Sequence, residues 1–149
     1  MLPSDDKVLL KAELEDLSLA LLEEPKNYHG WQYRQWLIRR FEAWQDELAF
    51  IEDMLAKDPY NNSAWNHRFY VLTCNTALFD ADHELACIKL AIEMSAKFDV
   101  VNQSAVGYAH ALMCMSQSDQ WRDSLVKTLQ ATSIAHHAAF VKIFNIGDK

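Results

Sequence analysis

The sequence predicts an all-α protein in which α-α hairpins stack into a superhelix, a TPR-like solenoid of about four helical pairs. Three observations predict this class. Glycine and proline number only three each among 149 residues, whereas a β-sandwich or barrel needs many of them for its turns. Two segments match at an offset of 34 residues. Apolar residues recur at helical spacing within both segments, and paired helices with such a period stack on their neighbours.

The internal repeat aligns residues 13–38 with residues 47–72 and contains seven identities. A block that matches two tryptophans at the same spacing is hard to obtain by chance. We therefore interpret the pattern Pro-x-Asn-x-x-x-Trp-x-x-Arg as the signature of a structural repeat. The identical pairs are Glu13/Glu47, Leu14/Leu48, Leu21/Leu55, Pro25/Pro59, Asn27/Asn61, Trp31/Trp65 and Arg34/Arg68.

Each unit is predicted to be two helices joined by a short loop. The first helix of the first unit carries an apolar stripe, Leu14, Leu17 and Leu21, with the +3 and +4 spacing of one helix face. Pro25 ends that helix because proline cannot continue it. Asn27 is a natural N-cap for the second helix, since its side chain accepts a hydrogen bond from a free backbone N–H. The second unit repeats the whole pattern.

Two further units are predicted from weaker patterns. Residues 85–92 repeat the apolar stripe, but the proline that should follow is missing, Val106 replaces the tryptophan and Ala109 replaces the arginine. A fourth pair begins at Ser118 and carries no motif. We expect one domain over 1–149, with repeats at about 13–44, 47–75, 84–117 and 118–145. The expected helices are about 5–24, 27–44, 46–57, 61–75, 82–97, 102–117, 118–131 and 134–145.

Charge and composition exclude several classes of function. The net charge of −7 disfavours binding to nucleic acid or to an anionic membrane surface, because both depend on basic side chains. No apolar run approaches the length of a membrane span, and the N-terminal residues do not read as a signal peptide. The three cysteines are odd in number and form no C-x-x-C pair. This usage fits a reducing cytosol, so we expect a cytoplasmic protein without disulfides.

Enzyme and metal motifs are mostly absent from the sequence. There is no glycine-rich nucleotide loop, no G-x-S-x-G and no H-E-x-x-H. We find no histidine paired with a second ligand at metal-binding spacing on one helix face, so we expect no metal site. Asp5 and Asp6 lack the third carboxylate of a D-D-x-x-D magnesium site and are interpreted as a charged first helical turn. The six histidines are His29, His67, His83, His110, His136 and His137.

The segment 25–36 is the densest candidate site. It places a cation, a phenol and an imidazole at the start of a predicted helix, whose N-terminus attracts anions and could hold a phosphate with Lys26. The alternative is a capping loop with solvated side chains. The pairs Trp31/Arg34 and Trp65/Arg68 share a helix face and admit either a cation–π or substrate contact or a structural role. Their recurrence favours an arginine that ties adjacent hairpins together.

These segments resemble a known family. Residues 25–36, PKNYHGWQYRQW, and residues 58–69, DPYNNSAWNHRF, are similar to successive repeats of the protein prenyltransferase α subunit. The form Asn-Asn-Ser-Ala-Trp-Asn-x-Arg resembles the α subunit shared by protein farnesyltransferase and type I geranylgeranyltransferase more than the Rab-prenylating one. The resemblance is strong over residues 13 to about 75, weaker to about 112 and loose beyond that point.

The resemblance implies a crescent of helical hairpins wrapped around a β subunit. In the family, the β subunit holds the catalytic zinc and most of the isoprenoid and peptide pocket. The implied reaction transfers farnesyl or geranylgeranyl from its diphosphate to a cysteine near the C-terminus of a target protein. This chain is therefore expected to carry no catalytic residue and no cofactor, and to be inactive alone.

The resemblance also assigns expected roles to residues. The family has an additional upstream repeat whose lysine lies at the diphosphate, and residues 25–44 resemble the repeat that follows it. We therefore expect a shortened chain that covers the middle repeats. Lys26, Asn27, Tyr28 and His29 would face the β subunit and the substrate. Structural roles in the repeat are expected for Pro25, Trp31, Arg34, Pro59, Asn61, Trp65 and Arg68.

Two alternatives stay open at this point. The first is a non-catalytic TPR-like scaffold that kept the repeat and lost the enzyme, which the degenerate third unit and the missing upstream repeat favour. The second is an incomplete gene product without an independent role. The leucine-rich first helix is a poor end cap for a solenoid. It suggests that the array was cut from something longer or is completed by a partner.

Overall fold

The computed structural model describes residues 3–147, with side chains up to residue 143, and this part of the chain is all-helical. The expected domain over 1–149 thus includes four terminal residues that lie outside the described range. The helices are α1 (Ser4–Glu23), α2 (Tyr28–Arg40), α3 (Glu47–Lys57), α4 (Asn62–Cys74), the 3₁₀-helix η1 (Thr76–Leu78), α5 (Ala81–Ala96), α6 (Gln103–Met115), α7 (Asp119–Thr132) and α8 (Ile134–Gly147).

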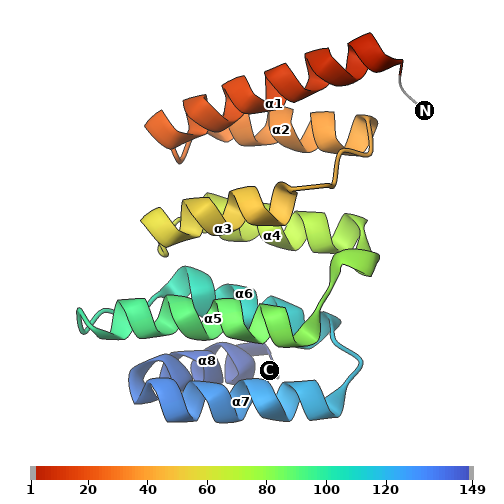
Figure 1. The fold of residues 1–149 in the computed structure, drawn as a ribbon. Helices are drawn as coiled ribbons and strands as arrows, with labels where there is room; N and C mark the ends of the chain where they lie inside the picture. Colours follow the sequence, from red (N-terminus) through yellow and green to blue (C-terminus); the bar gives the residue numbers. More distant parts are fainter. Residues whose placement is uncertain (1–2, 148–149) are drawn as a thin grey trace.

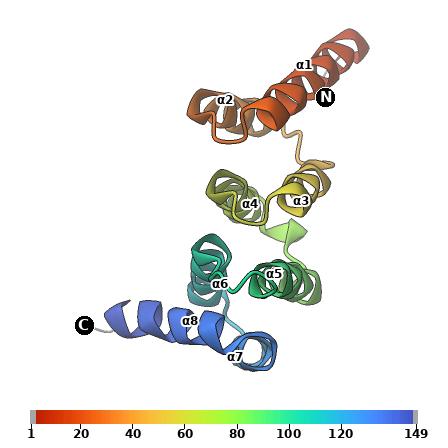
Figure 2. The ribbon, with the colours of Figure 1, turned by 90° about the vertical axis from the view of Figure 1, so that its left-hand side faces the viewer.

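The helices form four hairpins that stack one on the next, from α1–α2 to α7–α8 (Figure 1). Viewed from the side, the odd-numbered helices lie in one layer and the even-numbered helices in the other (Figure 2). The loops inside the hairpins all lie along one edge of the stack, at the left in Figure 1. This arrangement confirms the predicted all-α superhelix of hairpins.

Asparagine, aspartate and serine side chains begin most of the helices. Asn27 Oδ1 accepts a hydrogen bond of 3.1 Å from the backbone N–H of Gly30, and the equivalent Asn61 Oδ1 accepts one of 3.1 Å from that of Ala64. These bonds satisfy backbone donors that have no partner inside the helix. The same capping geometry is present at Asp80, Asn102 and Ser118.

Helix α2 ends at Arg40, four residues before the expected end at about residue 44. Glu42 adopts a left-handed backbone with φ of 51°, and the N–H of Ala43 donates to the carbonyl of Ile38 at 2.9 Å. This is the Schellman arrangement, which closes the last helical turn. Glycine is the usual residue at that position, and a glutamate there gives no stop signal in the sequence.

The apolar stripes predicted from the sequence form the core between the layers. Leu21, Ile51, Ile88 and Ile92 are fully buried, so one member or more of each of the three predicted stripes is removed from water. Leu125 is fully buried in the fourth hairpin, for which the sequence predicts no stripe. Each such aliphatic side chain contributes about 1.5–3 kcal/mol through burial. Trp65 packs against Tyr108 of the following hairpin with ring centroids 4.8 Å apart. The core therefore runs continuously through the stack.

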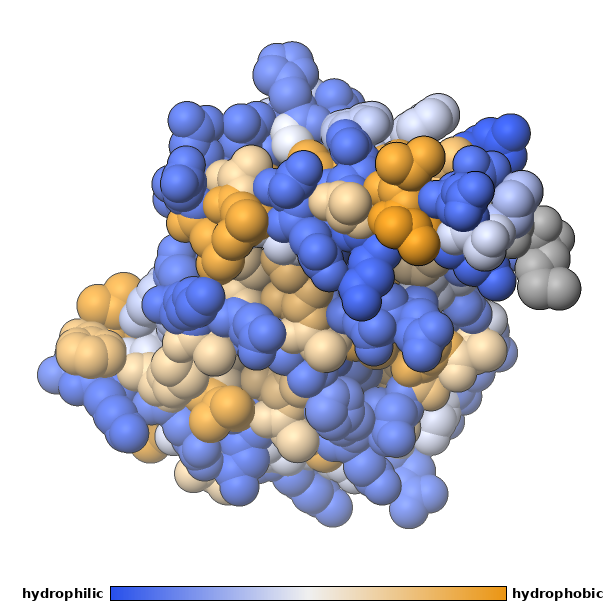
Figure 3. Space-filling view, turned by 45° about the horizontal axis from the view of Figure 1, so that its top comes forward, coloured by the Kyte–Doolittle hydropathy of each residue, from blue (hydrophilic) through white to orange (hydrophobic). Residues whose placement is uncertain are grey.

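The outer face of α1 keeps apolar side chains in contact with solvent. Val8 and Leu9 are each 68% exposed, and Leu19 is 63% exposed. Figure 3, which brings this end of the stack forward, shows apolar side chains scattered among polar ones there. Within residues 3–147, no helix has both the length and the apolar character needed to cross a membrane.

Candidate functional site

The proline and tryptophan of the repeat motif close the loop inside each of the first two hairpins. Trp31 Nε1 donates a 2.8 Å hydrogen bond to the carbonyl of Pro25, and Trp65 Nε1 donates one of 2.8 Å to the carbonyl of Pro59. Both indoles are otherwise buried in the core. The six-residue spacing of the motif thus closes the loop over the start of the second helix and leaves no indole donor unpaired.

The asparagine of the motif joins the second and the third hairpin to the one before it. Asn61 Nδ2 donates to the carbonyl of Pro25 at 3.3 Å, and Asn102 Nδ2 donates to the carbonyl of Pro59 at 2.6 Å. Each side chain therefore caps its own helix through the oxygen and holds the preceding loop through the nitrogen. In the first hairpin, Asn27 Nδ2 instead donates to Glu24 of the same loop at 3.0 Å.

Arg34 ties the first hairpin to the second through a buried ion pair. Its Nε and Nη2 donate to the two oxygens of Glu47, at 3.0 and 2.6 Å. Nη1 donates to Ser18 Oγ at 2.9 Å. The guanidinium lies 3.7 Å from the centre of the Phe50 ring, a cation–π geometry. The second carboxylate oxygen of Glu47 also lies 2.8 Å from His67 Nε2, in its own hairpin.

Arg68 repeats this arrangement between the second and third hairpins. Its Nε and Nη2 donate to the two oxygens of Glu84, at 2.7 and 2.6 Å, and both groups are fully buried. Tyr108 Oη donates to the same carboxylate from the third hairpin. A third acceptor is Glu52 Oε1, 3.1 Å from Arg68 Nη2. Two-point arginine–carboxylate pairs fix orientation as well as distance, so they set the register of the stack.

These networks shift the pKa values of their members. Burial opposes ionisation of Glu47, but hydrogen bonds from His67 and Arg34 outweigh it and lower the pKa of that carboxyl. Burial likewise opposes the charge on Arg68, yet the hydrogen bonds and charge of Glu84 raise the pKa of the guanidinium. Burial and the neighbouring Glu84 raise the pKa of Tyr108. Glu47 and Arg68 are therefore charged at neutral pH.

Sequence reasoning missed the acidic and phenolic members of these networks. The recurrence of Glu13 as Glu47 was visible in the internal repeat, but nothing linked it to an arginine in the preceding hairpin. Glu84 was further obscured because the third unit has a longer loop. An acidic residue directly before each apolar stripe could have indicated these carboxylates. Acidic side chains are rarely buried unless they are paired, so a carboxylate next to a buried stripe predicts a buried cationic partner.

The four residues expected to face a partner lie at the start of the first hairpin's second helix. Lys26, Tyr28 and His29 are exposed, and Asn27 is half-buried because it caps α2. Tyr28 Oη accepts a 2.6 Å hydrogen bond from Gln32, and its ring lies edge-on to that of His29 with centroids 5.8 Å apart. The block therefore presents a cation and two polar rings to solvent beside a helix N-terminus.

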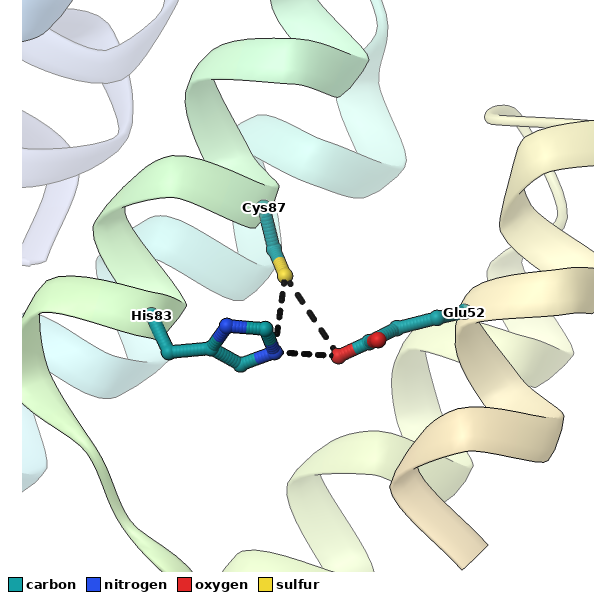
Figure 4. A group of neighbouring side chains, drawn as sticks. All are labelled: Glu52, His83 and Cys87. Atoms are coloured by element: carbon teal, nitrogen blue, oxygen red, sulfur yellow. Dashed lines mark hydrogen bonds and ion pairs between the residues drawn. The ribbon is translucent and has the colours of Figure 1, made fainter.

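A second group of reactive side chains lies between α3 and α5 (Figure 4). Glu52 projects from α3, while His83 and Cys87 project from α5 and point toward it. His83 Nε2 lies 2.6 Å from Glu52 Oε1, and Cys87 Sγ lies 3.6 Å from that oxygen and 3.7 Å from the imidazole nitrogen. Burial and the nearby carboxylates Glu52 and Glu84 raise the pKa of Cys87 to about 12, although Arg68 opposes the shift.

This group corrects one step of the sequence reasoning, which found no histidine paired with a ligand on one helix face. His83 and Cys87 are four residues apart on α5 and share a face, as do His110 and Cys114 on α6. The expectation that no histidine shares a helix face with a second ligand is therefore wrong for both histidine–cysteine pairs. The third member, Glu52, comes from another hairpin, 31 residues before His83.

The fold and these contacts define a class: a stack of α-α hairpins whose motif residues close the loops and whose arginines join successive hairpins. Residues 10–41 and 44–75 each match the family described as the protein prenyltransferase alpha subunit repeat. The chain therefore contains two repeats of the protein prenyltransferase α-subunit type, which confirms the resemblance drawn from the sequence. The matched residues hold both copies of the Pro-x-Asn-x-x-x-Trp-x-x-Arg motif.

Curated relatives carry corresponding names. The chain is 51% identical over 61 residues to protein farnesyltransferase/geranylgeranyltransferase type-1 subunit alpha of Dictyostelium discoideum, a match covering 41% of this chain and 19% of the relative. It is 47% identical over 36 residues to the protein of the same name from Pisum sativum, covering 24% and 11%. It is 35% identical over 71 residues to geranylgeranyl transferase type-2 subunit alpha of Rattus norvegicus, covering 46% and 12%.

These matches span between 11% and 19% of the length of the three relatives. Proteins of both the type-1 and the type-2 description are among them, so the expected preference for the shared type I subunit stays a prediction. No solved structure matches the chain significantly.

Proposed function

We propose that the chain works as the α-subunit component of a heterodimeric protein prenyltransferase, which transfers farnesyl or geranylgeranyl from its diphosphate to a C-terminal cysteine of target proteins. The observation that carries this proposal is the pair of α-subunit repeats at residues 10–41 and 44–75, with relatives named as α subunits. In this proposal the β subunit holds the zinc and most of the substrate pocket. The chain alone is then inactive.

The exposed block at the start of α2 is the surface that we propose to meet the substrate and the partner. Lys26 supplies a positive charge, and the N-terminus of α2 adds its own partial positive charge beside it. An isoprenoid diphosphate is the anion that this combination would attract. Tyr28 and His29 add hydrogen-bonding rings on the same exposed loop edge.

The first experiment tests assembly. The chain is co-expressed with a farnesyltransferase β subunit, and the mass of the purified species is measured by light scattering. We expect a 1:1 heterodimer, which would make transfer assays worthwhile. A lone chain beside free β subunit would overturn its role as a working subunit with that partner, and a geranylgeranyltransferase β subunit is tested in parallel.

The second experiment tests the block. Within a heterodimer, Lys26→Ala is expected to raise the KM for the isoprenoid diphosphate by about tenfold, the size of one charge-assisted hydrogen bond. Lys57→Ala is the matched control, because this exposed lysine ends α3 near the same edge and is outside the proposed surface. Equal effects of both substitutions would contradict a specific role for Lys26.

A non-catalytic scaffold is the second candidate, and one observation favours it. The third and fourth hairpins keep the fold but lack the Pro, Trp and Arg of the motif, with Ala109 in the arginine position. A stable complex that shows no transfer with either isoprenoid diphosphate would support the scaffold. Transfer that depends on Lys26 would exclude it.

A further inference from the structure

The group formed by Glu52, His83 and Cys87 has the donor set and spacing of a transition-metal site. Its three ligand atoms all lie within 4.8 Å of one another. A tetrahedral zinc ion with sulfur, nitrogen and oxygen ligands separates them by about 3.3–3.6 Å. The two distances from Cys87 Sγ, 3.6 and 3.7 Å, already fit. The 2.6 Å contact between His83 and Glu52 has to open by about 0.7 Å to admit the ion.

An internal comparison shows that the stack does not require these three side chains. In the junction between the first and second hairpins, the equivalent positions carry a hydroxyl, a carboxylate and a phenyl ring. Ser18 accepts a hydrogen bond from Arg34, as Glu52 does from Arg68. Phe50 covers the Arg34 guanidinium, whereas Cys87 is the equivalent neighbour of the Arg68 guanidinium. The equivalent residues are Ser18, Asp46 and Phe50. The second junction therefore replaces side chains that suffice for stacking with three metal ligands.

The charges around the group also favour a divalent cation. Arg68 is already matched by two hydrogen bonds to Glu84, so Glu52 is a second carboxylate beside a single guanidinium. A divalent ion that binds the Glu52 carboxylate and displaces the thiol proton of Cys87 adds one net positive charge, which balances the excess carboxylate of the junction. Glu52 and His83 have side chains 35% and 50% exposed, so the ion can reach them from solvent.

We propose that Glu52, His83 and Cys87 bind a zinc ion between the second and third hairpins, a site separate from the zinc expected in a β subunit. Thiolate, imidazole and carboxylate together are ligands that zinc accepts, whereas magnesium and calcium prefer oxygen alone. On binding, the sulfur–zinc bond forms and the thiol proton leaves to solvent. Three protein ligands leave a fourth position for water. A cavity of about 260 Å³ adjoins the group, with Leu55, Trp65, Leu90 and Met94 in its wall.

The test uses the full chain, stripped with a chelator and titrated with Co²⁺ and then Zn²⁺. We expect a thiolate-to-cobalt charge-transfer band in the near ultraviolet that saturates at one equivalent and disappears when zinc displaces cobalt. Calorimetry gives the zinc affinity directly. A wild-type chain with no such band and no stoichiometric zinc would overturn the proposal and identify the group as a plain hydrogen-bonded cluster.

Variants separate this site from other cysteines. Cys87→Ser should abolish the band and weaken zinc binding by at least about tenfold, while Glu52→Gln should keep the band and weaken binding. Cys114→Ser is the matched control: Cys114 also follows a histidine by four residues, with sulfur and nitrogen 3.9 Å apart, but no carboxylate completes a trio there among the described residues. A band that survives Cys87→Ser and vanishes in Cys114→Ser would refute the assignment.

A folding control keeps the outcome interpretable. Helical content and thermal melting are measured for each variant, and His83→Gln is the second ligand variant if Cys87→Ser melts early. Zinc should raise the Tm of the wild type and of Cys114→Ser, because it binds only the folded junction. It should raise the Tm of a ligand variant less, because that variant binds zinc more weakly. An equal zinc-dependent rise in every variant would overturn the site.

Discussion

Individual charged residues hold this stack in register more specifically than its apolar core does. Arg34 and Arg68 each bind a carboxylate from the next hairpin with two hydrogen bonds. Such pairs cost desolvation and contribute little net stability compared with apolar residues of the same volume. Removing one partner is much worse than replacing both, since a charge then stays buried without compensation.

Glu47→Gln should therefore lower the free energy of unfolding by about 3–5 kcal/mol, because the charge of Arg34 stays buried without its carboxylate. Urea unfolding measures the change. Lys89→Ala is the control: its ion pair with Glu93 is exposed, at 3.8 Å, and its loss should cost under about 1 kcal/mol. The double variant Arg34→Met/Glu47→Leu should recover most of the loss. A double variant no better than the single one would contradict this account.

His136 predicts a dependence of stability on pH. Burial lowers the pKa of this ring below its usual 6.5, and its Nε2 accepts a 2.9 Å hydrogen bond from the backbone N–H of Asn102. Because the folded pKa is depressed, the unfolded chain binds the proton more readily. The stability is thus present above pH 6.5 and falls as the pH drops below it.

Melting curves over the pH range of histidine titration check this. His136→Gln should flatten the decline in Tm below pH 6.5. His137→Gln is the neighbouring control, and it should leave the decline in place because that ring makes no such bond among the described residues. An unchanged slope in His136→Gln would assign the effect to another group.

At the scale of a helix, the motif asparagine has two separable roles, as an N-cap and as a contact between hairpins. Asn61 caps α4 and holds the Pro25 carbonyl of the preceding hairpin. Asn27 caps α2 with the same geometry but reaches no preceding hairpin. The two positions therefore share the cap, while only Asn61 adds a contact between hairpins; Asn27 is also less buried and donates to Glu24 of its own loop.

Asn27→Ala should cost about 0.5–2 kcal/mol of unfolding free energy, the usual value of an N-cap. Asn61→Ala should cost about 1 kcal/mol more, because it also loses the partly buried hydrogen bond to the Pro25 carbonyl. Both are measured by urea unfolding. Equal losses would show that the contact with Pro25 contributes nothing to stability.

The helices could be predicted from the sequence because their signals are local. A proline, a capping asparagine and an apolar stripe lie within 15 residues, so the positions of α1 to α4 follow from pattern alone. The end of α2 could not be predicted, because Glu42 closes the helix in a conformation that glycine usually adopts. The 3₁₀-helix η1 also had no sequence signal.

The sequence alone placed Lys26, Tyr28 and His29 together in one motif, and all three are exposed. Their substrate-facing role stays a prediction. The ionic partners of the arginines had no local signal. Arg34 and Glu47 are 13 residues apart on different helices, and Glu52 and His83 are 31 apart. Whether such residues meet depends on how the hairpins stack. The register of that stacking cannot be derived from local sequence patterns.

At the scale of the whole molecule, the first three hairpins share buried charges across each junction. Separating two of them would expose an arginine and a carboxylate from a common network, so these units should not unfold one at a time. Repeat arrays with weak junctions do unfold in parts. We expect tryptophan fluorescence, which reports on five tryptophans including the buried Trp31, Trp65 and Trp121, and far-ultraviolet circular dichroism to give coincident urea transitions. Two separate midpoints would contradict this.

The paired charges also give the stack a direction. Each of the first two hairpins offers a guanidinium to its successor, and the second and third offer a carboxylate to their predecessors. At the last junction the arginine position holds Ala109 and the carboxylate position holds the buried Trp121. Trp121 is the equivalent of Glu84 because each stands one helical turn before the buried apolar stripe of its helix.

At the opposite end, Glu13 raises the pKa of Tyr33, as Glu84 contributes to raising that of Tyr108. Glu13 precedes the α1 stripe as Glu47 precedes that of α3. An engineer who extends the array ahead of α1 should therefore place an arginine in the added module where Arg34 stands. A module appended after α8 would meet Phe140 in that position and should present an apolar surface instead. New modules at the two ends are not interchangeable.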